Sequence, residues 1–142
     1  MAHFLRTASA VWHGTGADGS GSLDGPSGVL SGTPYSAAKR FQNEDGKAGT
    51  NPEELVGAAH AGCFSMKLSF VIGSMGFVPG NIDTVAKVTF EDGKISNIHL
   101  DLKASVEGMS DEQFQAAALE AKQTCPISVS LNTEITLTAE LV

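Results

Sequence analysis

Apolar and polar residues alternate most regularly between residues 83 and 106. The apolar positions of this stretch are Ala86, Val88 and Phe90, followed by Ile98, Leu100, Leu102, Ala104 and Val106. An alternation of period two is typical of strands that bury one face. The Asp-Gly pair of the intervening "EDGK" favours a two-residue turn. The pattern therefore predicts an antiparallel β-hairpin.

The same period recurs more weakly towards both ends of the chain. It predicts a half-buried strand from Phe4 to Trp12 and a terminal strand from Ile135 to Leu141. The segment "TPYSAAKRFQ", residues 33–42, carries an aromatic residue near each end and predicts a further strand. Six glycines within residues 14–28 favour a flexible loop or hairpin tip between these strands.

A long helix is predicted to begin at "GTNPEEL". Asn51 can cap it, Pro52 suits its first position, and the carboxylates of Glu53 and Glu54 favour its positive N-terminal end. The only formally charged residue between positions 55 and 82 is Lys67. Because no wide polar face remains, we expect this helix to be buried on nearly all sides.

A second helix is predicted from the capping-box pair Ser110 and Gln113. It should end at Cys125, because the residue before a proline is disfavoured in helical geometry. Together the elements predict an α+β protein, a single domain of residues 1–142, in which antiparallel sheets pack around the long helix. One sheet covers only one side of that helix, so we expect a second subunit on the other side and an obligate homodimer.

Composition excludes several classes of partner. The net charge of −7 disfavours nucleic acid and anionic membrane surfaces, which would repel the protein. The long apolar stretch is only marginally long enough for a membrane span and contains Lys67, His60 and several glycines, so we expect no membrane insertion. The first residues lack a signal-peptide pattern, which favours a cytoplasmic location. In that compartment two cysteines are typically catalytic, redox-active, metal-binding or buried.

Three motifs carry a resemblance to a known family. They are "PYSAAKRF", "GTNPEELVGAAHAGCFSM" and "CPIS". On these motifs the chain resembles the superfamily of osmotically inducible protein C (OsmC) and organic hydroperoxide resistance (Ohr) proteins, with the OsmC branch nearer. The resemblance extends over essentially the whole chain. It implies an intertwined homodimer around a buried helix that carries the reactive cysteine, and a thiol-dependent peroxidase for organic hydroperoxides and, more weakly, hydrogen peroxide.

The resemblance also implies roles for four residues. Cys63 would be the peroxidatic thiol and Cys125 the resolving thiol, which together form a disulfide during turnover. Arg40 and Glu53 match an active-site arginine and its partner glutamate. No cofactor is implied, and an external dithiol of the lipoyl type would be the reductant.

The chemistry of a peroxidatic thiol requires a cation of the kind that Arg40 would supply. A free thiol is ionised only to about 3% at neutral pH, and burial lowers that fraction further. A guanidinium beside Cys63 would lower the thiol pKa and stabilise the alkoxide that leaves the peroxide. Glu53 and Cys63 are ten residues apart, or about 15 Å along a helix. One arginine reaches both only along the helix or across a break, so we predict a kink or loop near Gly57.

Other interpretations of the cysteines remain open from the residues alone. Cys63 is equally typical of a buried core thiol, in a dimeric binding protein for an apolar ligand. A metal site would need Cys63 and Cys125 together with His60 and His99, although no local pair has zinc-ligand spacing. In the peroxidase interpretation, Phe64, Met66 and Phe77 predict an apolar pocket around the thiol that favours alkyl or lipid peroxides.

Overall fold

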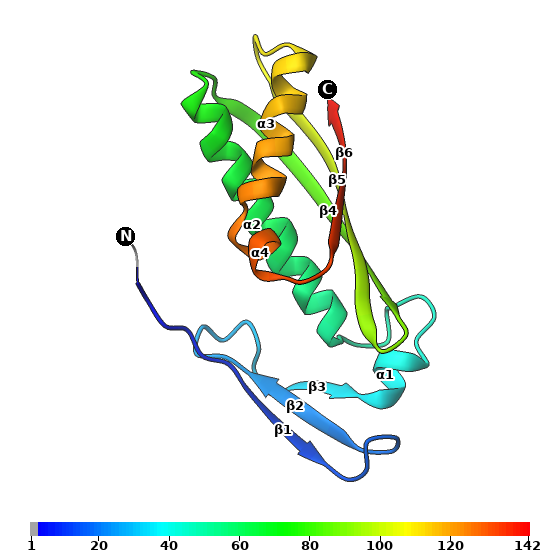
Figure 1. Cartoon of the computed structure of the whole chain (residues 1–142). Coiled ribbons are helices and arrows are strands. Elements are labelled where there is room, and N and C mark those ends of the chain that lie inside the picture. Colours follow the sequence, from blue (N-terminus) through cyan, green and yellow to red (C-terminus); the bar gives the residue numbers. More distant parts are fainter. Residues whose placement is uncertain (1–2) are drawn as a thin grey trace. The chain divides into compact units, whose positions relative to one another are not determined.

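The computed structural model describes residues 3–142, in which helices and strands form an α+β protein (Figure 1). The elements are β1 (Ser9–His13), β2 (Ser20–Asp24), β3 (Thr33–Ser36), α1 (Ala37–Phe41), α2 (Pro52–Ser74), β4 (Pro79–Glu91), β5 (Lys94–Val106), α3 (Asp111–Thr124), α4 (Pro126–Ser130) and β6 (Glu134–Leu141). They form two units, one that reaches to Pro52 and one of Glu53–Val142. The predicted α+β class is confirmed.

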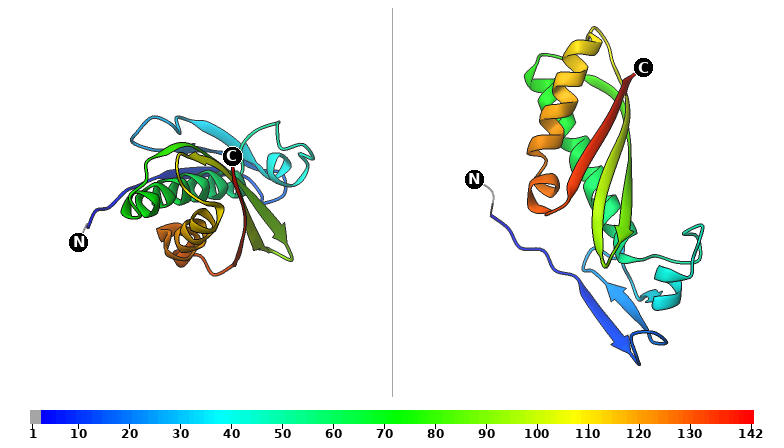
Figure 2. Two further views of the ribbon diagram at one scale, coloured as in Figure 1. Left: turned by 90° about the horizontal axis from the view of Figure 1, so that it is seen from above. Right: turned by 45° about the vertical axis from the view of Figure 1, so that its right-hand side comes forward.

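The second unit is built on one face of α2. Helices α2 and α3 lie on the same side of the sheet β4-β5-β6 (Figure 2). The buried apolar side chains of α2 and β5 are Phe64, Leu68, Val71, Ile72, Ile98, Leu100, Leu102, Ala104 and Val106. Burial of each large side chain stabilises the fold by about 1.5–3 kcal/mol, so this layer dominates the core.

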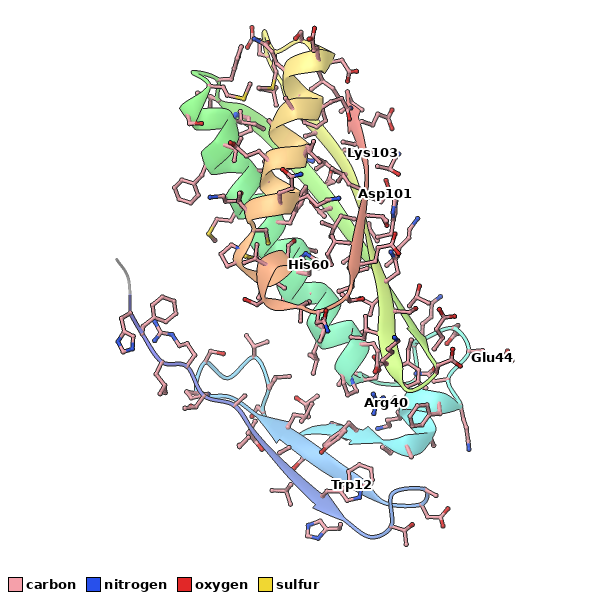
Figure 3. The ribbon with its side chains drawn as sticks, viewed as in Figure 1. Trp12, Arg40, Glu44, His60, Asp101 and Lys103 are labelled. Atoms are coloured by element: carbon pink, nitrogen blue, oxygen red, sulfur yellow. The ribbon has the colours of Figure 1, made fainter. Side chains whose placement is uncertain are left out.

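The predicted hairpin is confirmed as β4 and β5, which pair antiparallel and begin at Pro79. Asp92 and Gly93 both have positive φ, of 52° and 76°, as a two-residue type I′ turn requires. On the outer face of β5, Asp101 and Lys103 point away from the helices (Figure 3). Their alternation with the buried leucines gives the sheet one apolar face and one polar face.

The predicted terminal strand is present as β6, but it runs parallel to β5. The expectation of purely antiparallel sheets is therefore wrong for this pair, and the sheet is mixed. The reason lies in the connection, because a crossover through a helix such as α3 returns the chain in the same direction.

Helix α3 begins and ends where the sequence predicts. Ser110 and Gln113 form the complete capping box, and the helix ends at Thr124 before Cys125. The short helix α4 was not predicted. Pro126 occupies its first position, where a proline costs no hydrogen bond, so the residue that ends one helix also starts the next.

Helix α2 is continuous, so the predicted loop near Gly57 is wrong, and the alternative of a kink stays a prediction. A Cβ atom at Gly57 would lie 3.3 Å from Cγ2 of Val88, so this glycine allows close packing on β4. The predicted burial of α2 on nearly all sides includes cover by a second subunit, and that part stays a prediction. Only one face of α2 belongs to the core of this unit. By length and composition alone, α2 is also long and apolar enough to cross a membrane.

The face of α2 opposite the core is an exposed apolar stripe. It consists of Ala59, Gly62, Met66, Phe70 and Gly73, which recur every three or four residues. The Met66 and Phe70 side chains are 65% and 71% exposed. The stripe contains no charged residue.

The first unit contains the antiparallel sheet β1-β2-β3. The expected strand from Phe4 begins only at Ser9, and β2 lies within the glycine-rich segment that was predicted to be a loop. The segment 33–42 divides into β3 and the helix α1, which Ser36 caps. Among residues 3–52 none is buried, so this sheet has no core of its own.

Close approach of an aromatic ring and a backbone carbonyl explains why strand β2 has glycine at position 21. The rings of Trp12 and Tyr35 lie 5.2 Å apart, on either side of β2. A Cβ atom at Gly21 would lie 2.9 Å from the Tyr35 ring and would collide with the Val11 carbonyl oxygen. Only glycine fits between them.

Candidate active site

Cys63 lies on α2 at the border between the buried face and the apolar stripe. His60 precedes it by one turn and is buried, whereas Met66 follows by one turn and is exposed. Cys63 itself is partly exposed, and its side chain packs against the core. This position gives a thiol that an external molecule can reach while most of its surroundings stay apolar.

Cys125 lies between α3 and α4 and is completely buried. Its thiol shares a hydrogen bond with the thiol of Cys63, and both cysteines are free. The structure therefore brings together the two cysteines that the sequence assigned to one redox couple.

The second unit itself disfavours ionisation of Cys63. Burial raises the pKa of the Cys63 thiol, and the adjacent Cys125 thiol raises it further. The backbone N–H of Ile127 donates a hydrogen bond to the Cys63 sulfur, and this bond and the charge of Lys67 lower the pKa, but burial outweighs them. A lowered pKa, as expected from a neighbouring guanidinium, therefore needs a cation from outside this unit.

The sequence singled out His60 only as a member of the alternative metal set, yet it stands one turn before Cys63 on α2. Its Nε2 lies 2.7 Å from Oγ of Ser128, on α4. Its Nδ1 is buried without a hydrogen-bond partner. Burial lowers the pKa of His60, so the ring is held neutral. In Figure 3 His60 lies on α2 beside α4. In the sequence, the signal that could have identified His60 is a lone polar residue at a core-facing position of the predicted helix.

Arg40 belongs to the first unit and to the helix α1, where a strand was expected. It borders a pocket of about 190 Å³ whose other lining residues include Trp12, Tyr35 and Phe41. The guanidinium carbon lies 5.0 Å from the centre of the Phe41 ring. Glu53 stands in the first turn of α2, in the second unit. Contacts of Arg40 with Glu53 and Cys63 stay predictions.

The proposed metal set is not brought together. His99 lies on the outer face of the sheet, where its ring nitrogens are 2.7 Å from Thr136 and 3.0 Å from Thr138. Within residues 3–142, no three His, Cys, Asp or Glu side chains form a group that could hold a metal ion.

The three residues expected to line one pocket around the thiol are spread over the second unit. Phe64 is in the core and Met66 is exposed. Phe77 lies beyond the end of α2, beside Gly108. The predicted apolar pocket of Phe64, Met66 and Phe77 around the thiol stays a prediction.

Two adjacent free thiols, one partly exposed and one buried at a helix end, place this α+β protein in the class of dithiol redox proteins. The family model described as OsmC-like protein matches residues 44–140. Peroxiredoxin OsmC of Escherichia coli (strain K12) is 41% identical over 140 residues, which cover 96% of each chain. The chain belongs to the OsmC family, and the resemblance is confirmed.

More distant relatives agree with this assignment. An organic hydroperoxide resistance protein of Xanthomonas axonopodis pv. citri (strain 306) is 32% identical over 99 residues, which cover 66% of this chain and 68% of that protein. The solved organic hydroperoxide resistance protein of Elizabethkingia anophelis superposes with a TM-score of 0.68 at 28% identity, over 99% of this chain and 100% of that chain. The OsmC-like protein of Mycoplasma pneumoniae, at 12% identity, shares the fold with a TM-score of 0.75 over 99% of each chain.

The buried state of His60 predicts how stability depends on pH. Because its pKa is lowered in the folded protein, the unfolded chain takes up a proton first as the pH falls below about 6.5. The contribution of the neutral ring is therefore complete above pH 6.5 and declines as the pH falls towards the lowered pKa. We expect the free energy of unfolding in urea to fall more steeply below pH 6.5 in the wild type than in His60→Gln, by up to about 1.4 kcal/mol per pH unit. Parallel pH profiles would contradict this.

Proposed function

We propose that this protein is a thiol-dependent peroxidase that reduces organic hydroperoxides to alcohols and, more weakly, hydrogen peroxide. The observation that carries the proposal is the contact between the Cys63 and Cys125 thiols, in a chain 41% identical to a protein named peroxiredoxin OsmC. The names of the organic hydroperoxide resistance proteins support the substrate class.

Cys63 is the peroxidatic residue in this mechanism. Its thiolate attacks the outer oxygen of the hydroperoxide, the O–O bond breaks, and the alkoxide takes a proton to leave as the alcohol. Cys63 is now a sulfenic acid. The adjacent Cys125 sulfur attacks it, a disulfide forms and water leaves. An external dithiol of the lipoyl type returns two electrons and two protons by thiol–disulfide exchange, and no bound cofactor takes part.

Arg40 supplies the further positive charge that, with Lys67, outweighs the effect of burial on Cys63. Its guanidinium binds the peroxide oxygens, lowers the pKa of Cys63 and stabilises the alkoxide as it leaves. Glu53 fixes the guanidinium through a paired hydrogen bond. The pocket beside Arg40 supports an apolar substrate, because Trp12, Tyr35 and Phe41 offer aromatic surface to an alkyl group.

The protein acts as an intertwined homodimer in which residues 1–142 work as one domain. The exposed stripe of α2 and the absence of buried residues among residues 3–52 both leave apolar surface that a second copy would cover. A charge of −7 favours a protein partner over nucleic acid or an anionic membrane. We place the dimer in the cytoplasm, where dithiol reductants are available.

The cysteine roles are tested by peroxide turnover. Cys63→Ser should lower the turnover of tert-butyl hydroperoxide with dihydrolipoate about 10³-fold or more, because the nucleophile is removed. Cys125→Ser should still consume one equivalent and accumulate a sulfenic acid at Cys63 that dimedone traps. Turnover that survives Cys63→Ser would refute the proposal. Equal rates with hydrogen peroxide would refute the preference for alkyl peroxides.

Arg40 is tested by removing its charge. Arg40→Met should lower kcat/KM for tert-butyl hydroperoxide about 10²–10³-fold, since it removes a donor that stabilises the leaving alkoxide. The pH at which iodoacetamide alkylates Cys63 should rise at the same time. Lys39→Met is the matched control, because it removes a positive charge from the same helix. An equal loss in both variants would show that only the overall charge matters.

Assembly is tested at the apolar stripe of α2. Phe70→Glu should shift the mass by light scattering from a dimer to the 14.7 kDa monomer, because a carboxylate cannot be buried unpaired in an apolar interface. Leu119→Glu, at a 46% exposed position of α3, is the control and should stay dimeric. A monomeric wild type at micromolar concentration would contradict the proposed dimer.

A further inference from the structure

His60 is a polar residue with no exposed surface, in the same core face of α2 as Phe64 and Leu68. Burial of an imidazole is costly unless its nitrogens are hydrogen-bonded, and here only Nε2 is. A buried N–H without a partner is more costly than a free lone pair, which favours the tautomer whose Nε2–H donates to Ser128. The single bond to Ser128 therefore accounts for the orientation of the ring.

This hydrogen bond runs beside the thiol contact and joins the same two segments. His60 stands three residues before Cys63 on α2, and Ser128 stands three residues after Cys125, in α4. Two residues three apart on a helix are neighbours on its surface. The two segments are thus connected by Cys63 with Cys125, by the Ile127 N–H with the Cys63 sulfur, and by His60 with Ser128.

We propose that the His60–Ser128 hydrogen bond is a positioning contact that holds α4, and with it Cys125, against Cys63, and so sets the reduction potential of the thiol pair. A disulfide forms only when its two Cα atoms lie about 4.4–6.8 Å apart, so small movements of α4 change how readily the sulfurs meet. The proposal deepens the proposed function, on which its relevance to turnover rests, but the potential itself is defined without any peroxide.

The chain offers a matched hydrogen bond for comparison. Oγ of Ser65, also on α2, lies 2.7 Å from the hydroxyl of Thr84 on β4. It has the same length as the His60–Ser128 bond and joins α2 to the sheet instead of α4. Ser65→Ala therefore removes a comparable contact of the same helix without freeing the segment of Cys125.

The test is equilibration of the full-length protein in glutathione buffers. Cys63 and Cys125 together lose two electrons and two protons to glutathione disulfide, which becomes two glutathione thiols. Ser128→Ala should shift this equilibrium about tenfold towards the dithiol, which makes the reduction potential about 30 mV less negative. Ser65→Ala should lower the melting temperature and leave the potential within error of the wild type. An unchanged potential in Ser128→Ala, or an equal shift in Ser65→Ala, would overturn the proposal.

Substitutions of His60 provide an independent check. His60→Gln should retain most of the wild-type potential, because its amide N–H can replace Nε2–H as the donor. His60→Leu should match Ser128→Ala, and the double variant should shift no further, because both changes remove the same bond. Additive shifts in the double variant would show that the two residues act separately and would overturn the proposal.

Peroxide turnover separates the two proposals. A wild type that forms the disulfide in glutathione buffer but consumes no tert-butyl hydroperoxide refutes the peroxidase and leaves the positioning contact standing. Normal turnover with a Ser128→Ala potential equal to that of the wild type refutes the positioning contact alone. In Ser128→Ala, attack on the peroxide should stay within about twofold of the wild type, while dimedone should trap more Cys63 sulfenic acid because resolution is slower.

Discussion

The burial of one face of α2 against β5 is the interaction on which the rest of the second unit depends. Because a helix turns every 3.6 residues, fixing Phe64, Leu68 and Ile72 in the core also fixes the direction of every other side chain on α2. His60 must then point inwards and Met66 outwards. Cys63 falls at the border between them, partly exposed beside an apolar interior. The accessibility of the thiol therefore follows from the packing of the helix.

The same packing leaves the other face of α2 uncovered in the single chain. Helix α2 cannot turn both faces to one sheet, so its stripe of small and apolar residues stays exposed. Residues 3–52 form a three-stranded sheet without a buried side chain, and such sheets need a covered apolar face to be stable. Both features leave apolar surface that the second copy of the proposed dimer would cover. In the proposed dimer, assembly is then part of folding as well as of function.

Local signals in the sequence predicted the elements whose causes are local. The Asp92-Gly93 turn and the capping box at Ser110 were enough to locate the hairpin and α3. Features set by distant parts of the chain were missed. Strand β2 lies in a glycine-rich segment and needs glycine at position 21, because the Tyr35 ring and the Val11 carbonyl leave no room for a side chain, and β6 is parallel because of its helical crossover. In the site, the two cysteines were found through family motifs. The His60–Ser128 hydrogen bond joins residues 68 positions apart, so it could not be predicted from local residue spacing.

The electrostatics of the thiol connect these observations. Within the second unit, burial raises the pKa of Cys63, and the nearby Ile127 N–H and Lys67 do not offset it. A thiol in this state is a poor nucleophile and is protected from indiscriminate oxidation. If Arg40 activates it, as proposed, the cation comes from the other unit of the chain or from a second copy. Reactivity would then depend on correct assembly, and a misassembled chain would carry an unreactive cysteine. The high intrinsic pKa is in that case a useful property of the site, because it ties the nucleophile to the complete active structure.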